Sequence, residues 1–265
     1  MTLEEALRQV PGWIEGQAAA PMPLPSGAHN KAFRVDTAAG RYVLRLQSAN
    51  ALRLGADHGR EAVLQALAAA HGLAPAVVYA EPGGHCLITE YAAGAGWVPA
   101  NMGDPASLER LGLLLRKLHA LAPPAVAPLR LDALIRQHCE RLSEAYPGER
   151  SALLALADRC DRQLRTIGSS TRPAAIVHND LHHSNIIDGP RLALIDWEYA
   201  GVADPLFDLA CVLAYYPEAR KMDAMLLECT GLERAASVEM LRTATTLFRI
   251  LSDLWSRVGR LDPEP

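Results

Sequence analysis

The first third of the chain alternates between apolar and polar residues in a way that predicts β-structure. Two pairs of such segments, each pair separated by a short turn, are expected to form β-hairpins: 32–37 with 41–46, and 76–80 with 85–90. Between the hairpins, apolar residues at helical spacing predict a helix over 57–71, which Gly72 would end. A capping-box pattern at Thr2–Glu5 predicts a short helix before these strands, ending at Pro11-Gly12.

The rest of the chain has mostly helical spacing. Gly and Ala are frequent over 92–103, which we expect to be a linker. Helices are predicted from Asp104-Pro105 to before Pro123, over 131–146, over 151–167 and along 205–258. Short apolar runs separated by polar turns interrupt this pattern at 174–177, 186–187 and 192–195. We therefore expect a β-rich first third and a mostly helical remainder with one irregular polar segment inside it.

Composition excludes several classes of protein. The chain has 265 residues, of which 50% are hydrophobic, so it can bury a core without disulfides or structural metals. Its formal net charge of −4 argues against a nucleic-acid-binding protein, which would carry a basic excess. The chain has five cysteines, an odd number, and no C-x-x-C pair. This pattern is typical of reduced, buried cysteines. Because neither a signal peptide nor a membrane span is apparent, we expect a cytoplasmic protein that binds neither membrane nor nucleic acid.

The irregular polar segment carries the candidate chemistry. It reads His178-Asn179-Asp180-Leu-His-His-Ser-Asn185, followed by Ile195-Asp196-Trp-Glu-Tyr199. Phosphoryl-transfer sites of the kinase type use this layout. One Asp accepts the proton of the attacking hydroxyl, while an Asn five residues later and an Asp after a following strand hold Mg²⁺ on the phosphates. The pattern therefore favours a phosphotransferase.

Here the sequence resembles the choline/ethanolamine kinase group within the aminoglycoside-phosphotransferase-like superfamily. The most specific similarity lies in His178–Asn185, Leu194–Ala200 and Asp204–Asp208. Looser similarities cover Ser26–Asn30, Tyr42–Leu46, Arg60-Glu61, Leu73–Pro75, Ile88–Tyr91 and Phe248–Val258. The resemblance implies an α+β, protein-kinase-like two-lobed fold, with a small β-sheet N-lobe that has one main helix and a larger, mostly helical C-lobe. It implies a nucleotide-binding N-lobe over 1–91 and a catalytic, substrate-binding C-lobe over 92–265.

The resemblance also implies roles for individual residues. Asp180 would be the catalytic base and would contact the substrate together with Trp255, and His178 and Asp208 would support the catalytic loop. The metal ligands would be Asn185, Asp196 and Glu198. The nucleotide would be bound by Asn30, Arg45, Glu61, Glu90 and Ala92. The expected cofactors are ATP and Mg²⁺, and the expected substrate is a hydroxyl of choline or a similar small, cationic amino alcohol.

Other functions remain open from the sequence. The same motif serves thiamine kinases and aminoglycoside phosphotransferases. A metallohydrolase is an alternative of another class, because His178, Asp180, His182 and His183 could together bind zinc or a metal pair. A zinc hydrolase has no need of Asn185, however, whereas a kinase has. A pseudokinase that only binds its ligands is disfavoured, because the base, the metal ligands and the basic strand residue are all present.

Overall fold

The computed structural model describes residues 1–15, 19–25, 30–47, 56–168 and 172–261. The chain forms two compact units, each assembled from two separate pieces of sequence. The first unit contains Met1–Gly96 and Ile186–Tyr199, and the second contains Trp97–Asn185 and Ala200–Pro265. Strands dominate the first unit and helices the second, which confirms the predicted α+β class.

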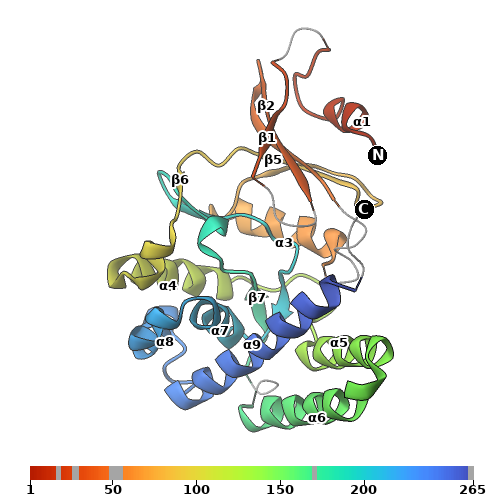
Figure 1. Ribbon diagram of the computed structural model, residues 1–265. Coiled ribbons are helices and arrows are strands. Elements are labelled where there is room, and N and C mark those ends of the chain that lie inside the picture. Colours follow the sequence, from red (N-terminus) through yellow and green to blue (C-terminus); the bar gives the residue numbers. More distant parts are fainter. Residues whose placement is uncertain (16–18, 26–29, 48–55, 169–171, 262–265) are drawn as a thin grey trace. The chain divides into compact units, whose positions relative to one another are not determined.

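An antiparallel sheet of five strands, in the order β1-β2-β3-β5-β4, is the framework of the first unit (Figure 1). Its strands are β1 (Met22–Leu24), β2 (Lys31–Thr37), β3 (Gly40–Leu46), β4 (Val77–Ala80) and β5 (Cys86–Glu90). Both predicted hairpins are confirmed, because β2 pairs with β3 and β4 pairs with β5. The central strand β3 therefore has hydrogen-bonded neighbours on both sides.

The main helix of this unit, α3 (His58–Ala70), begins and ends where the sequence predicts. The Asp57 side chain accepts a hydrogen bond from the backbone N–H of Arg60 and caps the helix. Gly72 follows the last turn with φ of 72°, a left-handed conformation that glycine adopts without a steric penalty. These two local signals set the length of α3.

The first helix, α1 (Leu3–Leu7), has the predicted capping box between Thr2 and Glu5 but ends earlier than predicted. Tighter backbone hydrogen bonds continue the turn to Val10, whose N–H donates to the carbonyl of Leu7. Val10 then joins a core that connects α1 to one face of the sheet: Ala6, Leu7, Val10, Val35, Tyr42, Leu44, Cys86 and Ile88. Because alternate strand residues point to opposite faces, Leu44 lies in this core and Arg45 points to the other face.

A second, three-stranded sheet completes the first unit: β6 (Ala95–Gly96), β8 (Ile186–Asp188) and β9 (Leu192–Leu194). The segment 92–103 is therefore not a plain linker, since it contains β6 and a 3₁₀ helix over Pro99–Gly103. The sequence-based division at 91/92 assigns 186–199 to the helical part, whereas the structure groups these residues with the first unit. The reason is pairing across the chain: β8 pairs with β6, and the N–H of Leu194 donates to the carbonyl of Leu73.

The second unit is built mainly from helices. These are α4 (Pro105–His119), α5 (Leu131–Ala145), α6 (Arg150–Thr166), α7 (Leu206–Tyr215), α8 (Asp223–Thr230) and α9 (Val238–Gly259). Asp104 caps α4 with Pro105 in its first turn, as predicted. In Figure 1 the long helix α9 runs beside α7 and α5, both of which it contacts. The predicted helical stretch 205–258 thus forms three α-helices, separated by a 3₁₀ helix (Pro217–Met222) and by turns.

A short antiparallel pair of strands, β7 (Ala175–Val177) and β10 (Gly201–Ala203), lies within the second unit. The residues that follow β7 form the polar loop, and those that follow β10 lead into α7. All five cysteines are free, and four of them are buried. Within the described residues, no helix is long and apolar enough to cross a membrane.

Candidate active site

Arg45 joins three elements of the first unit. It lies on β3, and its guanidinium forms ion pairs with Glu61 in the first turn of α3 and with Asp196, which follows β9. Sixteen residues separate Arg45 from Glu61, and 151 separate it from Asp196. The fold therefore brings together a strand cation, a helix carboxylate and a second carboxylate that are distant in sequence.

Glu61 is fully buried, and its ion pair and hydrogen bonds offset the energetic cost of that burial. Besides Arg45, its carboxylate accepts a hydrogen bond from Gln47 Nε2 at 2.8 Å and lies 3.2 Å from His58 Nδ1. A buried carboxylate is costly unless it is paired and hydrogen-bonded. The Asp196 side chain, by contrast, is 31% exposed. Of the two carboxylates on Arg45, only that of Asp196 is accessible to a ligand.

Asp196 and Glu198 form the candidate metal site in the first unit. Asp196 has φ of 63°, a left-handed conformation that is uncommon outside glycine and often found at functional sites. Burial and the neighbouring Asp196 raise the pKa of Glu198, against the opposing effects of Arg45 and Asn30. Asn30 Nδ2 donates to Glu198 Oε2 at 2.7 Å. Two neighbouring carboxylates, one of them accessible, suit a hard cation that prefers oxygen ligands, so this donor set fits Mg²⁺.

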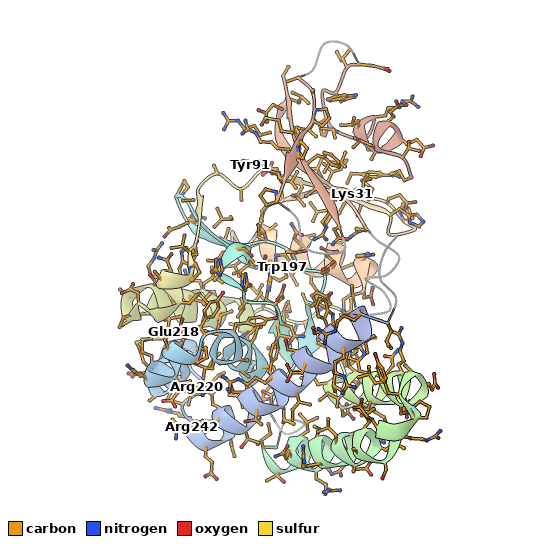
Figure 2. The ribbon with its side chains drawn as sticks, in the orientation of Figure 1. Lys31, Tyr91, Trp197, Glu218, Arg220 and Arg242 are labelled. Carbon is orange, nitrogen blue, oxygen red and sulfur yellow. The ribbon has the colours of Figure 1, made fainter. Side chains whose placement is uncertain are left out.

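The first unit contains a pocket of about 280 Å³ against the segment that follows β5. Its lining residues come from that segment, from the loop between α3 and β4, and from the β8–β9 hairpin: Ala74, Pro75, Glu90, Tyr91, Ala92, Ala93, Ile187, Pro190, Arg191 and Ala193. Tyr91 is labelled in Figure 2. The pocket includes Glu90 and Ala92 but not Asn30, Arg45 or Glu61. The predicted nucleotide residues thus fall into two groups, one around Arg45 and one at this pocket. Of the predicted loop Ser26–Asn30, residues 26–29 lie outside the described part of the chain.

In the second unit, Asp208 of α7 holds the backbone of the polar loop. Its two carboxylate oxygens accept hydrogen bonds from the N–H groups of His178 at 3.2 Å and Asn179 at 2.8 Å. His119 Nε2, at the end of α4, lies 2.9 Å from the same carboxylate. Asn179 has φ of 64°, and the paired N–H groups keep this left-handed residue in place. His178 itself is fully buried, as suits a residue that supports the loop.

The loop presents Asp180 beside two donors. Asn185 Nδ2 donates to Asp180 Oδ2 at 2.9 Å and to the Asp180 backbone carbonyl at 3.0 Å, which closes the turn between them. The Tyr215 hydroxyl donates to Asp180 Oδ1 at 3.2 Å. The N–H of Leu181 contacts Cys211 Sγ at 3.1 Å and anchors the next residue of the loop.

Sequence reasoning missed three of these partners: His119, Cys211 and Tyr215. No local pattern points to them, because each meets the loop only through tertiary contact.

The rings of His182 and His183 each contact a neighbouring hydroxyl group. His182 Nδ1 lies 2.9 Å from Ser184 Oγ, and His183 Nδ1 lies 2.6 Å from the Tyr216 hydroxyl. Burial, together with the proximity of His183, lowers the pKa of His182. In the residues that the structure describes, no group of three or more His, Cys, Asp or Glu side chains is placed to hold a metal ion. These contacts favour a structural role for the two histidines over the hydrolase alternative.

Trp255, the predicted substrate residue, lies half-buried on α9. Phe248, seven residues earlier on the same helix, contacts Tyr215 with ring centroids 5.9 Å apart. Seven helical residues correspond to about 10 Å along the axis. Phe248 is thus a ring of α9 that contacts Tyr215, one of the two donors to Asp180, and a substrate contact by Trp255 stays a prediction.

Comparison with known proteins identifies relatives of the chain. The family model described as "Phosphotransferase enzyme family" (APH) matches residues 22–235. Protein LicA of Haemophilus influenzae is 42% identical over 52 residues, which are 19% of this chain and only 20% of that protein.

Two solved structures are similar over almost the whole chain. A choline/ethanolamine kinase family protein from Mesorhizobium loti is 24% identical, with a TM-score of 0.74 over 97% of this chain and 85% of that one. A thermostable mutant of aminoglycoside phosphotransferase APH(4)-Ia, in a ternary complex with AMP-PNP and hygromycin B, is 20% identical, with a TM-score of 0.64 over 94% of this chain and 90% of that one. These likenesses confirm the protein-kinase-like fold predicted from the sequence.

Proposed function

Since the chain belongs to the phosphotransferase enzyme family, we propose that it transfers the γ-phosphoryl group of ATP to the hydroxyl of choline or a similar small amino alcohol. Membership of this family confirms the predicted class of enzyme, a small-molecule kinase. The nucleotide, the metal and the acceptor are the parts that we propose.

The ion pairs of Arg45 with Glu61 and Asp196 are the observation that carries the proposal. Kinase-type enzymes need a basic strand residue held by a helix glutamate, next to the carboxylate that binds the metal. We propose that Arg45 neutralises charge on the phosphates of ATP, while Glu61 fixes its guanidinium in place. Adenine contacts by the backbone of Glu90 and Ala92 and a nucleotide contact by Asn30 belong to the same proposal.

Asp196 and Glu198 are the proposed magnesium ligands, because their adjacent carboxylates supply the oxygen donors that this ion prefers. When bound, Mg²⁺ supplies positive charge next to the phosphate oxygens. That Asn185 adds a further ligand stays a prediction. The cation would also offset the raised pKa of Glu198 and keep its carboxyl ionised.

Asp180 is the proposed general base. As the acceptor oxygen bonds to the γ-phosphorus, the bond from that phosphorus to the bridging oxygen breaks and ADP leaves. The hydroxyl proton passes to the Asp180 carboxylate, whose position Asn185 and the Asp208-held loop backbone stabilise. Choline is favoured because aromatic rings gather at Tyr215, whose hydroxyl donates to this carboxylate: the centroids of His182 and Phe248 both lie within 6 Å of that of Tyr215. Ring faces attract cations by about 0.5–2 kcal/mol.

The acceptor is tested by measuring ATP consumption with choline, ethanolamine, thiamine and hygromycin B. We expect the highest kcat/KM with choline or ethanolamine. Faster turnover of thiamine or hygromycin B would contradict the proposed acceptor. Failure to consume ATP with every compound and also in their absence would contradict ATP-dependent transfer itself. A cytoplasmic location is also proposed, supported by five free cysteines.

The base is tested by Asp180→Asn, which keeps the shape of the side chain and removes the proton acceptor. We expect kcat to fall by about 10²–10⁴-fold, the usual cost of losing a general base. ATP affinity, measured by calorimetric titration, should not change. Asp253→Asn, an exposed site on α9, is the matched control and should keep the wild-type rate. Near-normal kcat in Asp180→Asn would remove this residue from the base role.

A further inference from the structure

Tyr215 is the last residue of α7, and its hydroxyl is the second side-chain donor on the Asp180 carboxylate. It donates to Oδ1 at 3.2 Å, while Asn185 Nδ2 donates to Oδ2 at 2.9 Å. One donor is local and the other is distant in sequence, since Asn185 is five residues from Asp180 and Tyr215 is 35 residues away. Each carboxylate oxygen thus has its own donor.

Neighbouring aromatic side chains hold the Tyr215 ring. Phe248 of α9 contacts it edge to face, with centroids 5.9 Å apart and an interplanar angle of 84°. His182 of the polar loop contacts it in the same way, at 5.8 Å and 85°. Edge-to-face geometry is favourable for aromatic pairs, and a tyrosine side chain has few rotatable bonds to restrict. The ring contacts therefore determine where the hydroxyl lies.

The orientation of the Asp180 carboxylate depends on its hydrogen bonds. The terminal torsion of an aspartate has only a broad preference, so a single donor leaves the carboxylate plane free to turn about that contact. Two donors on different oxygens fix the plane. An ionised carboxylate has about four lone-pair sites, so each oxygen can still accept a hydrogen bond from a substrate hydroxyl.

We propose that Tyr215 is a positioning residue for the catalytic base: its hydroxyl holds the Asp180 carboxylate in the plane from which it accepts the proton of the acceptor. This inference rests on the proposed function, in which Asp180 is the base. Misplacement of a reacting group by about 1 Å can cost about 10²-fold in rate. Because Asn185 remains in place, we expect loss of the Tyr215 hydroxyl to cost less, about 5- to 30-fold in kcat.

Tyr215→Phe tests the proposal, because it removes the donor and keeps the ring. The hydroxyl belongs to a residue that is 37% exposed, so its loss should leave the melting temperature unchanged. Turnover of ATP is measured with choline and without any acceptor. We expect kcat to fall in both assays, while the KM for ATP stays the same. Tyr146→Phe is the matched control: this tyrosine of the same unit is 43% exposed, lies under Arg257, and should keep the wild-type kcat.

Combining the variants separates positioning from a purely structural role. If Tyr215 acts through Asp180, adding Tyr215→Phe to Asp180→Asn should lower the residual rate no further. The same fold-loss in both backgrounds, or a kcat of Tyr215→Phe within about twofold of wild type, would overturn the proposal. ATP turnover that is absent from the wild type in both assays would overturn the proposed function and this inference with it. Turnover without acceptor that choline does not increase would exclude only choline, and the comparison of variants would stand on ATP hydrolysis.

Discussion

Arg45 and Asp196 show how one ion pair can combine a structural and a chemical task. Glu61 satisfies one side of the guanidinium inside the unit, while Asp196 on the other side stays accessible. Because these ion pairs already hold the Arg45 side chain in place, binding of a ligand there costs little additional conformational entropy. This division of roles between two carboxylates makes the metal proposal testable at the level of single residues.

Asp196→Ala removes a charged oxygen ligand from the proposed magnesium site. We expect the Mg²⁺ concentration at half-maximal rate to rise by about tenfold or more, since hard cations are held by carboxylates. Asn185→Ala should raise it less, because a neutral amide contributes no net charge. The measurement is a titration of initial rate with Mg²⁺, with Asp36→Ala, the partner of Arg34 in a partly exposed pair, as the control. Unchanged titrations in both variants would exclude these residues from the metal site.

Among the elements, α5 contains a feature that affects stability but not chemistry. His138 lies fully buried on this helix, which packs on α6 and α9. Within the described part of the chain, neither of its ring nitrogens has a hydrogen-bond partner. Burial, with a smaller effect of Arg141, lowers the pKa of His138 to about 4. The imidazole is therefore neutral in the folded chain at pH values where the unfolded chain would already bind a proton.

This buried histidine predicts a loss of stability in acid. The folded pKa lies below the unfolded value of about 6.5, so the contribution of His138 is complete above pH 6.5 and is lost as pH falls toward 4. The loss reaches about 3 kcal/mol at 1.36 kcal/mol per unit of pKa. In His138→Leu the free energy of unfolding, measured by denaturant titration between pH 4.5 and 7, should fall less steeply. Parallel curves for wild type and variant would show that His138 does not cause the acid sensitivity.

At the scale of the whole molecule, each of the two units is assembled from two separate pieces of the chain. The first unit needs residues 186–199, which lie far along the sequence from Met1–Gly96. These residues supply β8 and β9, the partner of Arg45, and Trp197, which is fully buried and donates to the Leu194 carbonyl at 2.9 Å (Figure 2). A unit of two pieces cannot be cut out as one continuous fragment.

A fragment of residues 1–96 should therefore fail to fold alone. It lacks the strand partner of β6, and it leaves Arg45 without the ion pair to Asp196. We expect no cooperative thermal transition by circular dichroism. Joining residues 186–199 to its C-terminus through a flexible Gly/Ser linker should restore one. A cooperative melt of the 1–96 fragment alone would show that the first unit is complete without the second piece.

Local signals made much of the fold predictable. The side-chain caps at Thr2, Asp57 and Asp104 define helix starts, and alternation defined both hairpins. These features depend on contacts within a few residues, which is why the sequence alone determines them. The polar loop is predictable for the same reason: Asp180 and Asn185 are five residues apart, and their hydrogen bonds close a single turn.

Tertiary structure decided what the distant residues do. It assigned residues 186–199 to the first unit, although they follow the polar loop directly in sequence. It brought Tyr215 to Asp180 across 35 residues and His119 to Asp208 across 89. It also holds Asn179 and Asp196 in left-handed conformations, which residues other than glycine seldom adopt. Such contacts carry no local pattern, because their stability comes from the packing and hydrogen bonding of segments that meet only once the chain has folded.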